Sequence, residues 1–148
     1  MQADTLQIIL IVEDSDDDFL ATTRAFKKSN LLNPIQRCSN GDQALDYLFQ
    51  RGEYTPDSAL RPGLIMLDLN LPGTDGREVL AMIKSTPELR MIPVIVLTTS
   101  DAEQDISRCY DAGANSYVKK PVDLGGFVEA IARLKEYWLG VAVLPKVS

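Results

Sequence analysis

The sequence predicts an α/β protein, a doubly wound (βα)5 fold in which five parallel strands alternate with five helices. Apolar runs alternate with amphipathic stretches along the whole of the 148 residues, and this alternation is typical of a parallel sheet covered by helices on both faces. The runs at 8–12, 64–67 and 94–97 consist almost entirely of Ile, Val, Leu and Met. Strands that are buried on both faces have this composition.

The first strand–helix pair carries clear start signals for its helix. Ser15 is a suitable N-cap, and the three acids at 16–18 suit the positive end of a helix dipole. The apolar spacing places four side chains on one buried face of this helix, namely Phe19, Leu20, Thr23 and Phe26. The elements expected in this half are a strand over 6–12, a helix over 16–29, a weak strand over 34–38 and a helix from 40 or 41 to 51.

Prolines and glycines separate the remaining elements. The segment Gly52–Pro62 contains two prolines and a glycine and is the longest expected loop, and Pro72-Gly73 marks a turn within 71–76. The elements expected between these breaks are a strand over 63–68, a helix over 77–85, a strand over 92–98, a helix over 102–112, a strand over 116–119 and a helix over 124–138.

Composition and charge narrow the class of protein. An apolar content of 45% and a charged content of 24% are ordinary for one globular domain. No apolar run approaches the roughly 18 residues of a membrane span, and the first residues lack the pattern of a signal peptide. We therefore expect a cytoplasmic protein without a membrane partner. The net charge of −6, with no concentration of Lys and Arg, argues against binding to nucleic acid.

The residue types also exclude several chemistries. The chain has no histidine, which excludes Ser-His and Cys-His nucleophile pairs and most zinc sites. Cys38 and Cys109 match no spacing of metal ligands, and we expect two buried, reduced thiols.

Polar side chains stand at the ends of four of the expected strands. Glu13-Asp14, Asp68, Thr98 and Lys120 each follow a different apolar run. Taken singly, each has an ordinary explanation as a helix cap, a turn former, a strand end or a solvated lysine. Because the carboxyl ends of parallel strands meet at one edge, where open α/β sheets bind ligands, we expect these groups to form one site.

Three carboxylates in one place indicate a cation and phosphoryl chemistry. Clustered carboxylates repel one another unless a cation lies among them, and ligands that are all oxygen favour Mg²⁺. Glu13 or Asp14 together with Asp68 would leave room for a phosphoryl ligand. A carboxylate needs no base to become a nucleophile, so Asp68 could attack a phosphoryl group in line while Lys120 and the Thr98 hydroxyl stabilise its oxygens.

The combined motifs identify a family. The segments 12–14, 66–76, 93–98 and 117–121 resemble the receiver domain of a two-component response regulator, and the resemblance covers about residues 6–138. It implies a flavodoxin-like sheet with the strand order 2-1-3-4-5. This is the order found in a known member of the family, and we adopt it by resemblance. We accordingly expect a receiver domain over 1–138 and an apolar tail over 139–148 without an effector domain.

The resemblance also implies the role of each acid. Asp68 would be the phosphoacceptor for a sensor histidine kinase. The side chains of Asp14 and Asp68 and the backbone carbonyl of Asn70 would hold Mg²⁺, and Glu13 would act directly or through water. The protein would not be an enzyme beyond its own phosphotransfer and autodephosphorylation.

Three further residues would respond to the phosphoryl group. By resemblance, Lys120 would contact it, with a cis peptide bond before Pro121, and Thr98 would be the switch hydroxyl. Tyr117 would be the switch aromatic, although a plain core position on the last strand remains an alternative for this residue.

The output of such a domain would be a contact with another protein or with a second copy of the chain. The apolar tail either folds back on the last helix or extends a homodimer interface. The tail and the long 52–62 loop resemble the small response regulators paired with bacterial phytochromes, which would make a phytochrome histidine kinase the phosphoryl donor.

Two other folds and one other role remain as alternatives. A haloacid-dehalogenase enzyme also uses an aspartyl nucleophile and Mg²⁺, but it requires a second Asp where Asn70 stands. A flavodoxin-like FMN protein requires a phosphate loop after the first strand, where the acids at 13–18 would repel a phosphate. A receiver that acts without phosphorylation is disfavoured by the intact site residues.

Overall fold

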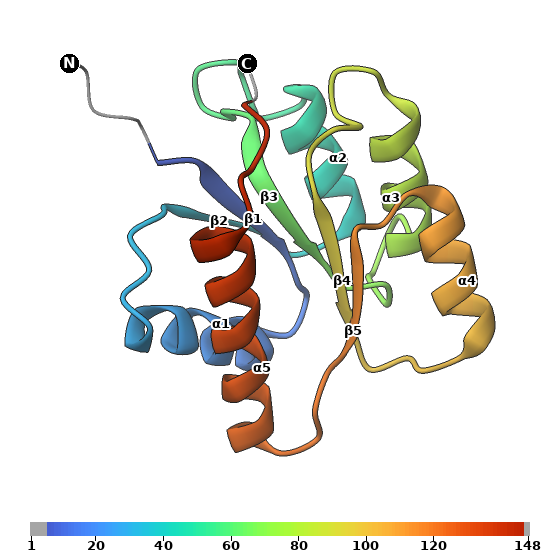
Figure 1. Cartoon of the computed structure of the whole chain (residues 1–148). Helices are drawn as coiled ribbons and strands as arrows, with labels where there is room; N and C mark the ends of the chain where they lie inside the picture. The colour runs from blue at the N-terminus through green and yellow to red at the C-terminus, as the bar shows by residue number, and fades with distance from the viewer. Residues whose placement is uncertain (1–5, 147–148) are drawn as a thin grey trace.

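The computed structural model, described over residues 6–146, contains a five-stranded parallel sheet in the order β2-β1-β3-β4-β5 (Figure 1). This confirms the predicted fold class and strand order. The strands are β1 (Ile8–Val12), β2 (Ile35–Cys38), β3 (Pro62–Leu67), β4 (Val94–Thr98) and β5 (Ser116–Lys119). The helices are α1 (Asp16–Lys28), α2 (Gly41–Phe49), α3 (Gly76–Ser85), α4 (Glu103–Ala112) and α5 (Leu124–Glu136), followed by a π-helical turn η1 (Tyr137–Val141). Residues 1–5 of the expected domain and 147–148 of the expected tail lie outside the described residues.

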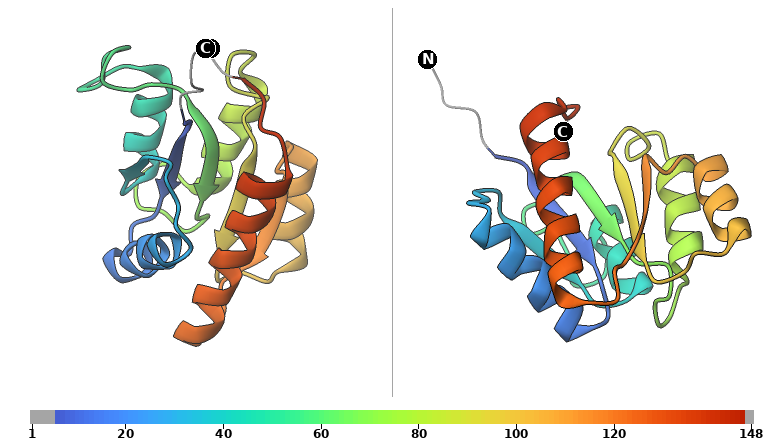
Figure 2. Two further views of the ribbon diagram at one scale, coloured as in Figure 1. Left: turned by 60° about the vertical axis from the view of Figure 1, so that its left-hand side comes forward. Right: turned by 60° about the horizontal axis from the view of Figure 1, so that its bottom comes forward.

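The helices cover the sheet in two layers (Figure 2). Helices α2, α3 and α4 pack on one face, through side chains such as Leu48 and Ile83. Helices α1 and α5 pack on the other, through Phe26 and Ile131. The central strands are buried on both faces, as their Ile- and Val-rich composition predicts. The thiols of Cys38 and Cys109 are free and buried, as predicted.

Helix α1 differs from the prediction at Leu20, whereas Phe26 is buried and Phe19 packs against the core as predicted. Its N-cap is Ser15, as predicted, and the Ser15 hydroxyl accepts a hydrogen bond from the backbone of Asp18 at 3.1 Å. However, Leu20 is 46% exposed, whereas Thr22 and Ala25 are buried. Apolar spacing alone places Leu20 inward, but α1 packs against both the sheet and α5, and this packing buries Thr22 and Ala25 beside Phe26 and leaves Leu20 outside.

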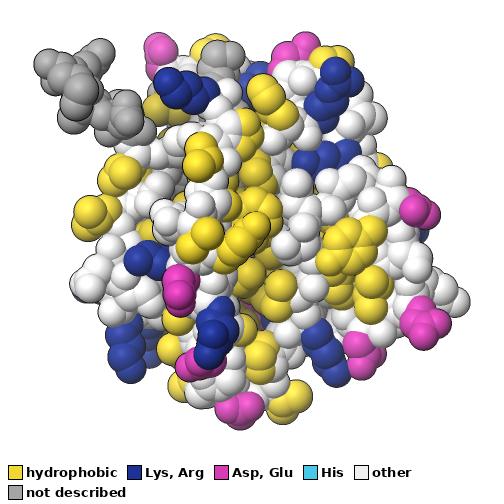
Figure 3. Space-filling view, viewed as in Figure 1, with side chains coloured by type: hydrophobic (Ala, Val, Ile, Leu, Met, Phe, Trp, Pro, Cys, Tyr) yellow, Lys and Arg dark blue, Asp and Glu magenta, His cyan; other side chains and the backbone are white. Residues whose placement is uncertain are grey.

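The segment after α5 folds back on its own domain. Trp138, Leu139 and Leu144 pack against the core cluster to which α1 and α5 contribute, and the Gln7 side chain donates a hydrogen bond to the carbonyl of Pro145 at 3.3 Å. Apolar side chains also remain on the surface here, with Val143 95% exposed, and Figure 3 shows hydrophobic atoms running down the middle of this face. The tail therefore packs in cis and still presents an apolar surface.

The turn between β3 and α3 brings the backbone close to the predicted acceptor. A side chain at Gly76 would place its Cβ 2.2 Å from the carbonyl oxygen of Asp68, so only glycine fits there. The Gly76 amide donates to the carbonyl of Leu69 at 2.9 Å. This contact fixes the course of the chain directly after Asp68.

Within the described residues, no helix is both long and apolar enough to cross a membrane.

Candidate functional site

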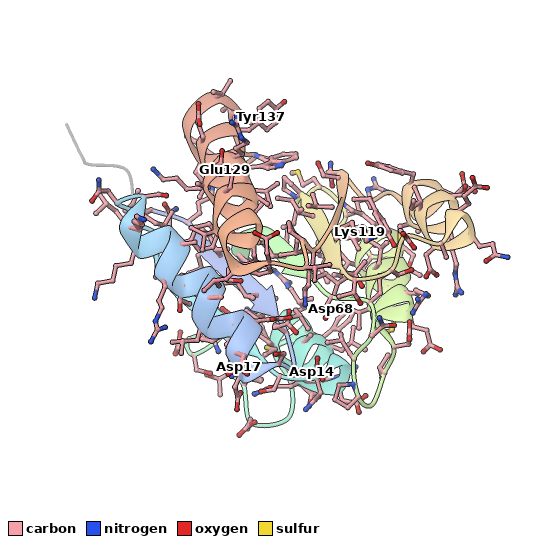
Figure 4. All side chains as sticks on the ribbon, turned by 90° about the horizontal axis from the view of Figure 1, so that it is seen from below. Asp14, Asp17, Asp68, Lys119, Glu129 and Tyr137 are labelled. Carbon is pink, nitrogen blue, oxygen red and sulfur yellow. The ribbon has the colours of Figure 1, made fainter. Side chains whose placement is uncertain are left out.

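The predicted polar groups meet at the carboxyl edge of the sheet. Glu13 follows β1, Asp68 follows β3, Thr98 ends β4 and Lys120 follows β5. Glu13, Asp68 and Lys120 are each less than a tenth exposed, and Thr98 is fully buried. Viewed from this edge, Asp14 and Asp68 lie near each other beside the start of α1 (Figure 4). The strand order therefore assembles side chains that are up to 107 residues apart in the sequence.

The Lys120 ammonium is the centre of the site. Its Nζ lies 2.6 Å from Glu13 Oε1 and 3.1 Å from Asp68 Oδ2. A third carboxylate, that of Asp18 on α1, accepts a hydrogen bond from the same nitrogen at 2.8 Å. An ammonium has three N–H donors, and here each of them has a carboxylate partner.

This arrangement shifts the pKa values of both buried partners. Burial raises the pKa of Glu13 to about 7, although the hydrogen bond from Lys120 and its positive charge act in the opposite direction. Burial on its own would lower the pKa of Lys120, but hydrogen bonds to Asp18 and Glu13 and the charge of Asp68 outweigh it, so the pKa lies above its ordinary value. Lys120 is therefore charged at neutral pH, and the carboxylates around it outnumber it.

The carboxylates could also hold a divalent cation. Oxygen atoms of Glu13, Asp14 and Asp68 lie within 4.8 Å of one another. Asp14 is exposed, which gives an ion access from solvent. A set of oxygen ligands with an excess of negative charge suits a hard cation. The Asn70 amide donates to Asp68 Oδ1 at 3.3 Å, so the backbone of Asn70 lies beside this carboxylate, and its carbonyl remains a predicted ligand.

The predicted switch residues lie next to this cluster. The Thr98 carbonyl accepts a hydrogen bond from the Lys120 amide at 2.7 Å, which ties β4 to the lysine. The Thr98 hydroxyl is 3.5 Å from the Ser100 amide. The Tyr117 hydroxyl donates to the Ser100 carbonyl at 2.9 Å, and the Tyr117 ring is partly buried against the core. Ser100 thus connects the two predicted switch residues.

One prediction about Lys120 is wrong. The described residues contain no cis peptide bond, so the bond before Pro121 is trans rather than cis. The trans form is the lower in free energy even before proline, and in this geometry the Lys120 ammonium already reaches both Glu13 and Asp68.

A second polar network braces the loop after β4. Arg77 on α3 forms a bidentate pair with Asp105 on α4, with nitrogen–oxygen distances of 2.7 and 2.8 Å. The Ser100 hydroxyl donates to the same carboxylate at 2.6 Å. Hydrogen bonds from Arg77 and then Ser100 lower the pKa of Asp105 to about 2. Bidentate pairs of this kind are geometrically demanding, so the network holds α3, α4 and the 98–102 loop together.

We expect this network to contribute to stability above pH 4 and to lose that contribution in acid. The pKa of Asp105 is lower in the folded protein than its ordinary value of 3.8, so protonation below pH 4 favours the unfolded chain. Asp105→Asn should cost about 2 kcal/mol near neutral pH and progressively less as the pH falls toward 2. Urea unfolding across this range, with the exposed Asp111→Asn of the same helix as the control, measures the difference. A cost that did not change with pH would contradict this expectation.

Sequence reasoning missed three residues of these networks. Asp18 is predicted only as an acid of a helix start, and no role is predicted for Arg77 or Asp105. Asp18 lies three residues after Ser15, as the acid of a capping box does. This local explanation gave no reason to expect that Asp18 contacts Lys120, which is 102 residues away. No local pattern marks the Arg77–Asp105 pair, because its two helices approach each other only in the folded sheet.

A parallel five-stranded sheet with an acidic cluster and a buried lysine at its carboxyl edge defines the class of protein. The chain belongs to the response regulator receiver domain family, whose model matches residues 9–132. This confirms the family that the motifs indicated.

Individual relatives match nearly the whole chain. Response regulator Rcp1 of Synechocystis sp. is 40% identical over 139 residues, which cover 94% of this chain and 93% of Rcp1. FilR2 of Methanothrix harundinacea, a probable methanogenesis regulatory protein, is 39% identical over 140 residues, which cover 95% of this chain and 88% of FilR2.

Two solved structures are similar in fold and sequence. The Mn²⁺-bound form of Rcp1 matches with a TM-score of 0.90 at 40% identity, covering 95% of this chain and 99% of that one. The phosphorylated cyanobacterial phytochrome response regulator RcpA matches with a TM-score of 0.90 at 42% identity, covering 96% of this chain and 100% of that one. The chain is thus a response regulator receiver domain homologous to a phytochrome response regulator.

Proposed function

We propose that this protein accepts a phosphoryl group on Asp68 from a sensor histidine kinase, with Mg²⁺ bound beside it. The observation that carries the proposal is the placement of the Asp68 carboxylate between a buried ammonium and two further carboxylates. Such a site combines a nucleophile, a fixed positive charge and oxygen ligands for a cation. Phosphoryl transfer depends mainly on positioning and charge stabilisation.

The transfer step balances without a further reactant. An oxygen of Asp68 attacks phosphorus and forms a P–O bond, and the P–N bond to the kinase's phosphohistidine breaks. The electron pair of that bond returns to the imidazole nitrogen. This chain contains no histidine, so the phosphohistidine must come from the partner. Water later hydrolyses the acyl phosphate, which returns Asp68 to the carboxylate.

Each residue of the site has a task in this step. Lys120 stabilises the phosphoryl oxygens by charge and hydrogen bonding. Asp14, Asp68 and the Asn70 carbonyl would hold Mg²⁺, with Glu13 direct or through water, and the ion would neutralise the phosphoryl oxygens. The similarity to the Mn²⁺-bound form of Rcp1 supports the binding of a divalent ion by this chain. The protein is in this proposal a phosphoacceptor and not an enzyme for other substrates.

The signal would arise from movement around Ser100. A phosphoryl group on Asp68 adds charge and hydrogen-bond acceptors, toward which the Thr98 hydroxyl moves. Because the Ser100 carbonyl holds the Tyr117 hydroxyl, the loop after β4 and the Tyr117 ring shift together. The surface of α4, β5 and α5 then changes its shape.

We further propose that the output is association with a protein, including a second copy of this chain. The exposed side chains of Tyr137, Val141 and Val143 give the C-terminal segment an apolar surface of the kind that favours association. Sedimentation velocity on the phosphorylated and unphosphorylated protein tests the dimer, and a monomer in both samples at high concentration would contradict it.

The similarity to RcpA supports a phytochrome kinase as the phosphoryl donor. We place this transfer in the cytoplasm, where ATP is available to phosphorylate such kinases.

The acceptor role is tested with a small acyl phosphate. We expect the intact mass of the wild type to rise by one phosphoryl group in Mg²⁺ and to rise little in EDTA. Asp68→Asn should gain none, because the amide is not a nucleophile here. Asp57→Asn, an exposed loop position, serves as the control for the loss of one charge and should behave as the wild type. Equal labelling of wild type and Asp68→Asn would refute the assignment.

A further inference from the structure

We propose that Asp18 is a positioning residue for Lys120. In this proposal Asp18 occupies the third N–H of the lysine in the unphosphorylated protein and is replaced there by a phosphoryl oxygen when Asp68 is modified. The inference rests on the proposed function, and it adds a competing ligand for the lysine.

The contact between Asp18 and Lys120 is not a by-product of helix capping. In a capping box, the acid three residues after the cap accepts a hydrogen bond from the backbone amide of the cap residue. Here the Ser15 amide donates instead to Glu13 Oε2 at 3.1 Å. The Asp18 carboxylate is therefore free to reach across from α1 to Lys120, where its Oδ2 lies 2.8 Å from Nζ.

The three partners of Lys120 differ in how easily each can be released. The side chains of Glu13 and Asp68 are 6% and 9% exposed, whereas the Asp18 side chain is 40% exposed. A buried carboxylate that loses its cation stays without hydration, but an exposed one is solvated by water at once. Since all three N–H groups are in use, a new phosphoryl oxygen must displace one partner. Asp68 itself becomes the carrier of the phosphoryl group, and of the other two carboxylates Asp18 has the lower cost of release.

Competition of this kind has a defined consequence. The charged Asp18 stabilises the state in which Lys120 faces α1, and so it opposes the state in which Lys120 faces a phosphoryl group. A neutral amide at position 18 is a weaker partner for an ammonium. Asp18→Asn should accordingly shift the equilibrium toward the phosphoryl-bound site, without any change in the residues that bind the group itself.

The test is the affinity of the full chain for beryllofluoride, a stable mimic of the phosphoryl group on aspartate, measured by calorimetry in Mg²⁺. Removing one partly exposed ion pair should tighten the apparent affinity of Asp18→Asn by about fivefold. Asp17→Asn is the matched control, because this exposed residue lies in the same first helical turn and its replacement removes the same charge. Figure 4 labels Asp17 on α1 beside Asp14. Asp17→Asn should bind as the wild type does.

Further variants separate the role of the Asp18 charge from the acceptor function of Asp68. Asp18→Glu retains the charge and should restore affinity to near that of the wild type. Unchanged or weaker binding by Asp18→Asn, relative to Asp17→Asn, would overturn the competing role. If the wild type fails to bind beryllofluoride at all, or binds it no better than Asp68→Asn does, the proposed acceptor function itself fails, which is a separate result. Thermal melting of each variant shows whether the fold is retained.

Discussion

Replacing Lys120 with methionine should destabilise the folded protein by about 3 kcal/mol at pH 8 without divalent cations, because buried carboxylates that lose their cation are strongly unfavourable. Methionine preserves most of the volume of the lysine stem, so the loss reports on charge rather than on a cavity. Glu13 and Asp68 would remain buried side by side with no ammonium between them.

The same variant should become relatively more stable as the pH falls. In the wild type the pKa of Glu13 is already raised to about 7, and without Lys120 it should rise further. A carboxyl group with a raised pKa binds more protons in the folded state than in the unfolded state, so acidification from pH 8 to 5.5 favours folding. Added Mg²⁺ should restore part of the stability at pH 8.

Urea unfolding at pH 8 and 5.5, with EDTA or Mg²⁺, measures these effects. Lys119→Met is the matched control, since the neighbouring Lys119 pairs with the exposed Asp101 and such surface pairs contribute little. If Lys120→Met were as stable as Lys119→Met at pH 8 in EDTA, the buried carboxylates would not depend on the Lys120 charge, and the expected result would be wrong.

Replacing Thr98 with valine should separate phosphorylation from its conformational response. Valine has nearly the same shape as threonine and fits the fully buried position, but it cannot donate a hydrogen bond to a phosphoryl oxygen. A hydrogen bond to a charged group contributes about 1.5–3 kcal/mol. Its loss should reduce the shift of the conformational equilibrium that phosphorylation causes by about tenfold or more. Acceptance of the phosphoryl group by Asp68 should continue.

Hydrogen–deuterium exchange of α4 and β5, with and without an acyl phosphate, measures the response. The wild type and Thr99→Val should change their exchange on phosphorylation, and the change in Thr98→Val should be much smaller. Thr99 is the exposed next residue and so controls for the substitution itself. A Thr98→Val variant that responded fully would show that the signal bypasses this hydroxyl.

Much of this architecture could be predicted from the sequence because an acid or a lysine directly follows several of the apolar runs. The apolar runs indicate buried parallel strands, and parallel strands share one carboxyl edge, so Glu13, Asp68 and Lys120 had to meet once the order of the strands was known. That order came from a family resemblance. Periodicity alone leaves several doubly wound arrangements open.

What escaped prediction depends on contacts between elements that have no local pattern. Asp18 was hidden by its place in the first turn of a helix, where an acid is ordinary. Arg77 and Asp105 pair across two helices that only the sheet brings together. The exposure of Leu20 follows from how α1 packs on its neighbours. The tail contains enough apolar residues for either predicted location, and the fold places part of it on the core and part of it in solvent.

Asp68, rather than any other oxygen at this crowded edge, should receive the phosphoryl group. Tandem mass spectrometry of peptides from the wild type, digested after acyl-phosphate treatment in Mg²⁺, locates the modified residue directly. We predict a single hydroxylamine-labile acyl phosphate on Asp68. A phosphoryl group on Glu13 or Asp14, or a hydroxylamine-stable ester on Thr98 or Ser100, would contradict the assignment of Asp68 as the acceptor.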